Sequence, residues 1–89
     1  MQAHKPQVGM LTGSQIRAAR GLLRISAAEL ARRADLSRPT IERAEATDDV
    51  PEMRTHTLLA IQRTLESAGI IFMDPGEQKP GGHGIRLRS

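Results

Sequence analysis

The chain has 89 residues, which limits it to one small domain and excludes multi-domain enzymes and repeat solenoids. Hydrophobic residues make up 38% and charged residues 26%, the composition of a folded globular domain rather than of a disordered chain. Because the chain has no cysteine, neither disulfides nor thiolate metal sites can stabilise it. The net charge is +3, and 11 of the 13 basic residues are arginine, whose guanidinium group matches phosphates and guanine edges.

The sequence also limits where the protein is expected to work. Its longest apolar run, residues 70–73, is far shorter than the roughly 18 to 20 residues of a membrane span. The first nine residues contain no apolar stretch of signal-peptide length. We therefore expect a cytoplasmic protein without a membrane segment, and a flexible N-terminal arm over residues 1–10.

Three segments begin with the same helix-capping pattern. Each has a polar cap residue that follows one hydrophobic residue and precedes another by four positions, as in a hydrophobic staple; the caps are Thr12, Ser26 and Ser37. Gln15 and Glu29 lie three residues after the first two caps, which predicts two capping boxes. The pattern predicts short helices over about residues 12–24, 26–34 and 37–46.

A fourth helix and a β tail are predicted after these three. The helix begins near Thr55 or Thr57, runs to Ala68 and is ended by Gly69. Beyond it, residues 70–73 and 85–88 have the composition of strands and flank a loop that contains glycine and proline. Since an isolated two-stranded ribbon is marginal in water, we expect the tail to pair with a second copy of the chain. The predicted dimerisation residues are Ile70, Ile71, Phe72, Ile85 and Leu87.

Residues 26–46 have the features of a helix-turn-helix. The two predicted helices are separated only by residues 35–37, and the second begins with arginine. On a helical wheel of the second helix, Ile41, Ala44 and Glu45 lie opposite Pro39, Glu42, Arg43 and Ala46. The first side is expected to dock on the domain, and the second to face a major groove of DNA.

The stretch from Ile25 to Glu45, ISAAELARRADLSRPTIERAE, resembles the phage-repressor-like, Cro/CI-type (xenobiotic-response-element) helix-turn-helix family. The resemblance covers residues 11–68, with Leu30-Ala31, Leu36-Ser37, Ile41 and Glu45 in register. Residues 68–72 and 84–88 are similar to the tail of a small bacterial subgroup of that family. The resemblance implies a mainly α fold, in which a four-helix repressor-like domain over residues 11–68 is followed by a short C-terminal β extension over residues 69–89.

The resemblance also implies roles for individual residues. The implied DNA-binding residues are Ser26, Ser37, Arg38, Pro39, Thr40, Glu42 and Arg43. Among them, Arg38 and Arg43 are expected to contact bases or phosphates, and Ser26 is expected to help hold a phosphate at a helix N-terminus. Arg20 and Glu45 match a pair that joins the first and third helices, and we assign this pair a structural role.

Three features depart from the family pattern. Ala27 stands where glutamine is frequent, which removes one phosphate contact, and Asp35 stands at a turn position where glycine is frequent. Asp48, Asp49 and Glu52 place negative charge in the loop after the third helix, where phosphates would approach. These departures predict weaker DNA binding, but they do not predict a different fold.

The sequence therefore predicts a homodimeric, sequence-specific, double-stranded DNA-binding transcriptional regulator, with repression as the expected mode. The alternative is a protein-interaction module, such as an antitoxin or a sequestering partner of another regulator, which docks through the acidic loop and the tail strands. Some arginines are open to two interpretations. Arg17, Arg24, Arg32 and Arg33 either follow phosphates or form a solvated face, and Arg86 and Arg88 belong either to a dimer strand or to a minor-groove arm.

Neither a cofactor, nor a metal, nor an enzymatic activity is expected. The three histidines, His4, His56 and His83, share no helical spacing that would suit a metal. The sequence has no recognisable Ser-His-acid arrangement and no glycine-rich phosphate loop after a strand. With Phe72 as its one aromatic residue, the chain is also a poor candidate for binding single-stranded nucleic acid by base stacking.

Overall fold

The computed structural model describes residues 11–73 and 84–88, so the predicted N-terminal arm lies outside the described residues. The elements are α1 (Gly13–Leu23), α2 (Ala27–Ala34), α3 (Arg38–Glu45), α4 (Thr55–Ser67), β1 (Ile70–Met73) and β2 (Gly84–Leu87). The predicted mainly helical fold with a short C-terminal β extension is confirmed. No helix in the described part of the chain combines the length and the apolarity needed to cross a membrane.

The predicted caps begin the first three helices. At α1, Thr12 accepts a hydrogen bond from the N–H of Gln15 at 3.0 Å, and the Gln15 side chain accepts one from the N–H of Thr12 at 2.9 Å, a complete capping box. At α2, Ser26 accepts from the N–H of Glu29 at 3.0 Å. The prediction of a second full box is wrong, because the Glu29 carboxylate accepts hydrogen bonds from arginines of its own helix instead.

Residues in the left-handed backbone conformation stand at the C-terminal ends of three helices. Arg24 ends α1 with a φ of 59° and Asp35 ends α2 with a φ of 60°. Aspartate adopts this conformation more readily than most residues, because its short polar side chain bonds locally. Glycine is therefore not required at position 35. Gly69 follows α4 with a φ of 109°, as expected for a glycine at a helix end.

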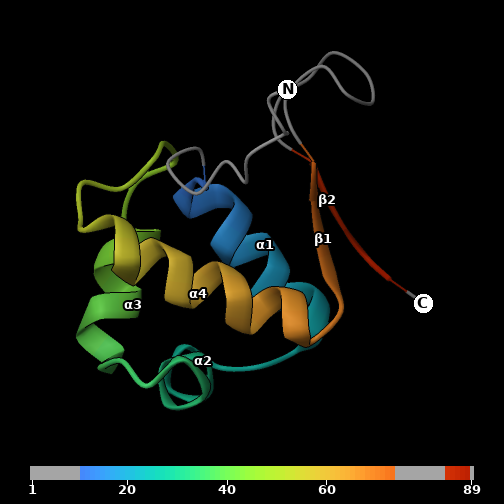
Figure 1. The fold of residues 1–89 in the computed structure, drawn as a ribbon, viewed down its shortest axis with the longest axis horizontal. Helices are drawn as coiled ribbons and strands as arrows, with labels where there is room; N and C mark the ends of the chain where they lie inside the picture. The colour runs from blue at the N-terminus through green and yellow to red at the C-terminus, as the bar shows by residue number, and fades with distance from the viewer. Residues whose placement is uncertain (1–10, 74–83, 89) are drawn as a thin grey trace, which may run out of the picture.

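The core lies where the four helices and the first strand meet. Six large side chains are almost completely buried, namely Ile16, Leu30, Ile41, Ile61, Leu65 and Ile70. The small residues Ala31 and Ala34 on the inner side of α2 are also buried, and α2 packs against α3 and α4. Figure 1 shows α4 lying across α1, with α3 at one end of the longest axis and the β hairpin at the other.

The two predicted strands are present, and they pair with each other in one chain, whereas the predicted loop between them lies outside the described residues. Ile70 lies opposite Leu87 and Phe72 opposite Ile85 in an antiparallel register. α1 packs against β2 and α4 against β1, so helices of the same chain stabilise the ribbon without a second copy. Ile70, predicted as a dimerisation residue, lies in the core of its own chain, and Phe72 and Ile85 are partly buried against that core.

Candidate nucleic-acid interface

α3 divides into a buried side and a solvent side. Ile41 and Ala44 are fully buried, whereas Pro39, Glu42 and Arg43 are exposed. The helical wheel predicts this division, because residues three apart in a helix share a face. The buried side holds α3 on the domain, and the polar side is left free to contact another molecule.

The first turn of α3 carries a pair of hydroxyl groups. Ser37 accepts a hydrogen bond from the N–H of Thr40 at 3.2 Å, and the two hydroxyl oxygens lie 2.8 Å apart. Only one of the two hydroxyl protons is needed for the contact between these oxygens, so the other can be donated to an external acceptor. When Thr40 donates to Ser37, the free proton is that of the exposed Ser37, which lies at the positive end of the helix dipole.

Arg38 and Glu42 pair along the outer side of α3. The Arg38 Nε lies 2.8 Å from a Glu42 carboxylate oxygen, and both side chains are more than half exposed. The pair uses one of the five N–H donors of Arg38 and leaves the terminal nitrogens available to a phosphate or a base. An exposed pair of this kind contributes little to stability, so a phosphate can displace Glu42 at little cost.

Arg43 lies at the other end of the exposed side, beside the acidic loop. It is exposed, and the described residues offer it neither a hydrogen bond nor an ion pair. It borders a hollow of about 410 Å³ whose other lining residues are Thr47, Asp49, Val50, Pro51 and Glu52. Asp49 and Glu52 line the same hollow as Arg43, so their negative charges would repel a phosphate bound at Arg43. The sequence predicts this repulsion.

The N-terminus of α2 offers a second group of donors. Ser26 is exposed and its oxygen caps the N–H of Glu29. The N–H groups of Ala27 and Ala28 belong to the first turn, where a helix supplies no partner of its own. This end of α2 has the chemistry of an anion site, with the alanine at position 27 in place of a longer donor.

Arginines of α2 are engaged within their helix. The Glu29 carboxylate accepts hydrogen bonds from Arg32, at 3.0 and 2.5 Å, and from Arg33, at 2.7 Å. These hydrogen bonds, with the charge of the two guanidinium groups, lower the pKa of Glu29 to about 2. The two arginines are therefore paired with a carboxylate in the free protein rather than simply solvated.

The low pKa of Glu29 predicts how this cluster responds to acid. The folded pKa lies below the ordinary value of 4.5, so the cluster stabilises the fold above pH 4.5 and this contribution is lost as the pH falls towards about 2. An NMR titration of the Glu29 side-chain carboxyl carbon should give a midpoint near pH 2. The stability difference between wild type and Glu29→Gln should shrink over the same interval, and a titration midpoint at 4 or above would contradict the cluster.

Arg20 and Glu45 form the predicted pair between α1 and α3. The Arg20 Nε and Nη2 lie 2.9 and 3.1 Å from the two Glu45 carboxylate oxygens, a bidentate contact. Arg20 also donates to the carbonyl of Ile25 at 3.0 Å, which the sequence did not predict. The hydrogen bonds that Arg20 donates to Glu45 raise the pKa of Arg20, against the opposing effect of burial. One guanidinium group thus joins α1, α3 and the loop between α1 and α2.

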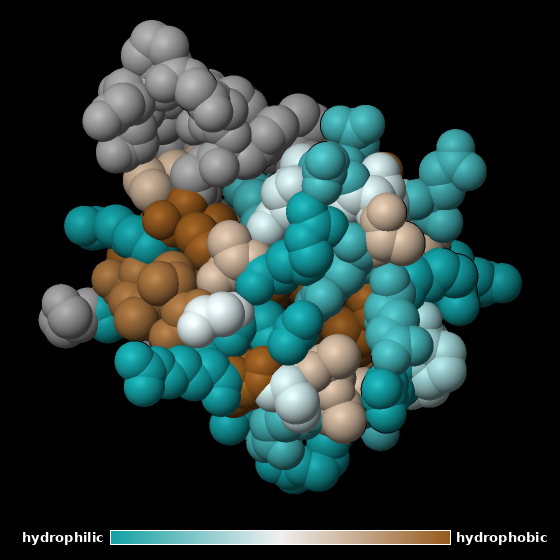
Figure 2. All heavy atoms as spheres, turned by 180° about the vertical axis from the view of Figure 1, so that it is seen from behind, coloured by the Kyte–Doolittle hydropathy of each residue, from teal (hydrophilic) through white to brown (hydrophobic). Residues whose placement is uncertain are grey.

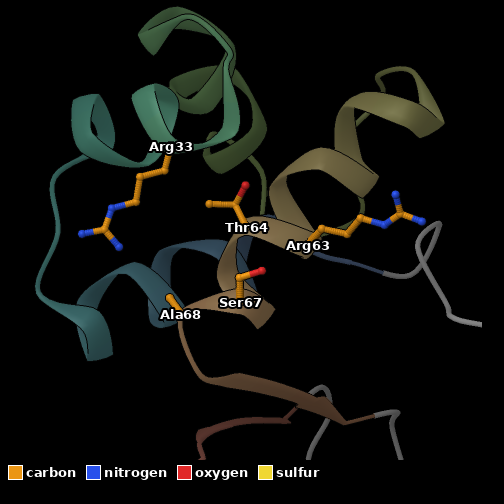
Figure 3. Close-up of a pocket in the computed structure, with 5 residues that line it drawn as sticks. All are labelled: Arg33, Arg63, Thr64, Ser67 and Ala68. Atoms are coloured by element: carbon orange, nitrogen blue, oxygen red, sulfur yellow. The ribbon is translucent and has the colours of Figure 1, made fainter.

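A second hollow, of about 340 Å³, does not form a comparable site. Its lining residues are Arg33 of α2, the α4 residues Arg63, Thr64 and Ser67, and Ala68, which follows α4. In Figure 3 the guanidinium groups of Arg33 and Arg63 extend in opposite directions, so they do not converge on one ligand atom. The described residues also contain no cluster of three or more histidine or acidic side chains arranged to hold a metal.

The polar face formed by α3 and the N-terminus of α2 thus combines hydroxyl, guanidinium and backbone N–H donors on two consecutive helices. Such donors recognise phosphate oxygens and the acceptor atoms of bases. Of the seven residues predicted for this face, all but the half-buried Thr40 are exposed. No protein-family model and no curated protein matches this chain.

Proposed function

We propose that this protein is a sequence-specific, double-stranded DNA-binding transcriptional regulator that inserts α3 into a major groove. The observation that carries the proposal is the division of α3 into a side buried by Ile41 and Ala44 and an exposed side with Arg38 and Arg43. An α-helix with its side chains is about 10 to 12 Å in diameter, so a major groove about 12 Å wide admits it. A connection of only three residues joins α2 to α3, which is the spacing of a helix-turn-helix.

The proposal includes a homodimer that places two copies of α3 on one side of a duplex, about 34 Å apart. Leu22 and Leu87 are the large hydrophobic side chains that the described residues leave exposed, at 44% and 40%. Figure 2 shows an apolar area at the end of the molecule that carries the hairpin. A second copy seated there covers this apolar surface and leaves α3, at the opposite end, free for DNA (Figure 1).

In the first step of the test, the full chain is used to select the DNA duplexes that it binds from a random pool. Fluorescence anisotropy then compares the selected duplex with a scrambled one at several salt concentrations, and the solution mass reports the dimer. Arg43→Ala is expected to weaken binding to the selected duplex by about 10- to 100-fold, because a bidentate arginine–guanine contact is lost. Arg63→Ala on α4 is the control, since it removes the same charge from an exposed site outside α3.

Two outcomes would refute DNA recognition by α3. One is a selection that enriches no sequence, with equal affinity for selected and scrambled duplexes. The other is an equal loss for Arg43→Ala and Arg63→Ala, which reports only the change in net charge. If the protein binds all duplexes equally but forms a stable complex with another protein, the result favours the protein-interaction module instead.

A further inference from the structure

The first turn of α1 lies directly against the end of α3 and the loop that follows it. The N–H of Gly13 donates to the carbonyl of Asp49 at 2.9 Å. A Cβ at Gly13 would lie 1.9 Å from the carbonyl oxygen of Thr47 and 2.7 Å from that of Ala44. Because both oxygens belong to the backbone, they cannot move aside as the end of a side chain can. The close approach of α1 to this segment therefore requires glycine at position 13.

Arg17, one turn along α1, holds the same segment through its guanidinium group. Its Nη1 donates to the carbonyl of Glu45 at 2.5 Å and lies 3.4 Å from that of Thr47. Its Nη2 donates to the Asp48 carboxylate at 2.5 Å and to the Ser14 hydroxyl at 3.2 Å. Glu45 is the last residue of α3, and its carbonyl has no partner inside the helix. Arg17 thus caps the C-terminus of α3 from another helix.

Asp48 is the acidic residue of the loop that this arrangement neutralises. The hydrogen bond from Arg17, and then that from Ser14, lower the pKa of Asp48, so the carboxylate stays ionised and paired. Asp49 and Glu52 are exposed and have no ion pair within the described residues. Arg17 therefore reduces the negative charge beside α3 and fixes where that charge lies.

We propose that Arg17 is a positioning residue for DNA recognition, which sets the C-terminal end of α3 without contacting DNA itself. The proposal rests on the function proposed above. Its guanidinium is occupied by one carbonyl of α3, the following loop and Asp48, so it is not available to follow a phosphate. Arg43 lies only two residues before Glu45, whereas Arg38 lies at the far end of α3. Loosening the cap therefore displaces Arg43 more than Arg38, and the base read by Arg43 loses discrimination first.

This positioning effect can be separated from an effect on folding. The side chains of Arg17 and Asp48 are 41% and 81% exposed, and exposed ion pairs contribute little to global stability. The core that holds α3 does not include them. Substitution of Arg17 is therefore expected to leave the melting temperature nearly unchanged while it alters DNA recognition.

The experiment compares wild type with Arg17→Gln, Arg17→Lys and the control Arg32→Gln, which removes an exposed arginine whose ion pair is with Glu29 of its own helix. Affinities are measured for the selected and the scrambled duplex, and amide chemical shifts are recorded without DNA. Arg17→Gln is expected to lower affinity for the selected duplex by about tenfold, because displacement of Arg43 weakens its contact with one base. It should lower affinity for the scrambled duplex by less than about twofold, since no phosphate contact is removed.

Arg17→Lys distinguishes geometry from charge. Lysine keeps the positive charge, but one ammonium group cannot replace a planar fork that reaches two carbonyls and a carboxylate. Arg17→Lys is therefore expected to have the wild-type affinity for the scrambled duplex. Its affinity for the selected duplex should fall as much as that of Arg17→Gln. In both variants the amide shifts should change at residues 44–49, and Arg32→Gln should leave those amides unmoved.

Three results would overturn the proposal. Equal losses on both duplexes identify Arg17 as a phosphate contact instead. A ratio of selected to scrambled affinity that matches the Arg32→Gln control removes any role in recognition. Unchanged amides at residues 44–49 show that Arg17 does not hold α3, and this readout decides the matter even if the wild-type protein discriminates between no duplexes and the proposed function itself fails.

Discussion

Replacing Ile41 by alanine is expected to lower the free energy of unfolding by about 2 to 5 kcal/mol, the range for a buried large-to-small substitution. Ile41 is fully buried and is the largest side chain that α3 contributes to the core. An eight-residue helix is too short to persist on its own, so it depends on this packing. Urea unfolding followed by circular dichroism measures the loss, and DNA affinity should fall together with it.

Leu22→Ala is the matched control for this prediction. It also shortens a branched aliphatic side chain to alanine, but at a position on α1 that is 44% exposed. At protein concentrations that keep the chain monomeric, the expected loss is less than about 1 kcal/mol, because little apolar surface of the single chain returns to water. At concentrations where the proposed dimer forms, any added loss reports the contact of Leu22 with the second copy. Equal losses for the two variants would show that α3 does not depend on Ile41 for its place on the domain.

Replacing Arg20 by methionine is expected to lower the free energy of unfolding by about 3 kcal/mol, because it leaves the Glu45 carboxylate without its partner. The Glu45 side chain is only 10% exposed, so water reaches this carboxylate poorly. The value is at the lower end for such a change because Arg20 itself is 27% exposed. Chemical denaturation of the single variants Arg20→Met and Glu45→Leu measures the two losses.

The double variant Arg20→Met/Glu45→Leu isolates the interaction energy between the two side chains from their contacts with other groups. It leaves no unpaired charge, so we expect it to be more stable than the sum of the two single losses predicts. Recovery should be incomplete, because the carbonyl of Ile25 also loses its donor. Strictly additive losses would show that the two side chains do not interact energetically.

The helix starts could be predicted because their causes are local. Thr12, Ser26 and Ser37 each bond to a backbone N–H three residues away, a contact that needs no other part of the chain. The burial of Ile41 and Ala44 follows in the same way from spacing along one helix. For these features sequence and structure agree.

Two pairs were missed although the sequence contains their signal. Arg38 and Glu42 are four residues apart on one helix, and so are Glu29 and Arg33. Opposite charges at this spacing attract each other on a helix surface. Glu29 could not both complete a capping box and serve two arginines, and the charged partners are the stronger hydrogen-bond donors to a carboxylate.

The sequence alone determined which segments become helices and which side of each is apolar, because those properties depend on residues within one turn of each other. Only the tertiary structure decided that Arg17 caps α3, that Gly13 leaves room for the backbone at Thr47, and that β1 pairs with β2 of the same chain. These contacts join residues from 11 to 34 positions apart in the sequence, for which no repeating spacing exists. Their geometry is set by how α1 packs against α3 and β2, and by the helices that cover the ribbon.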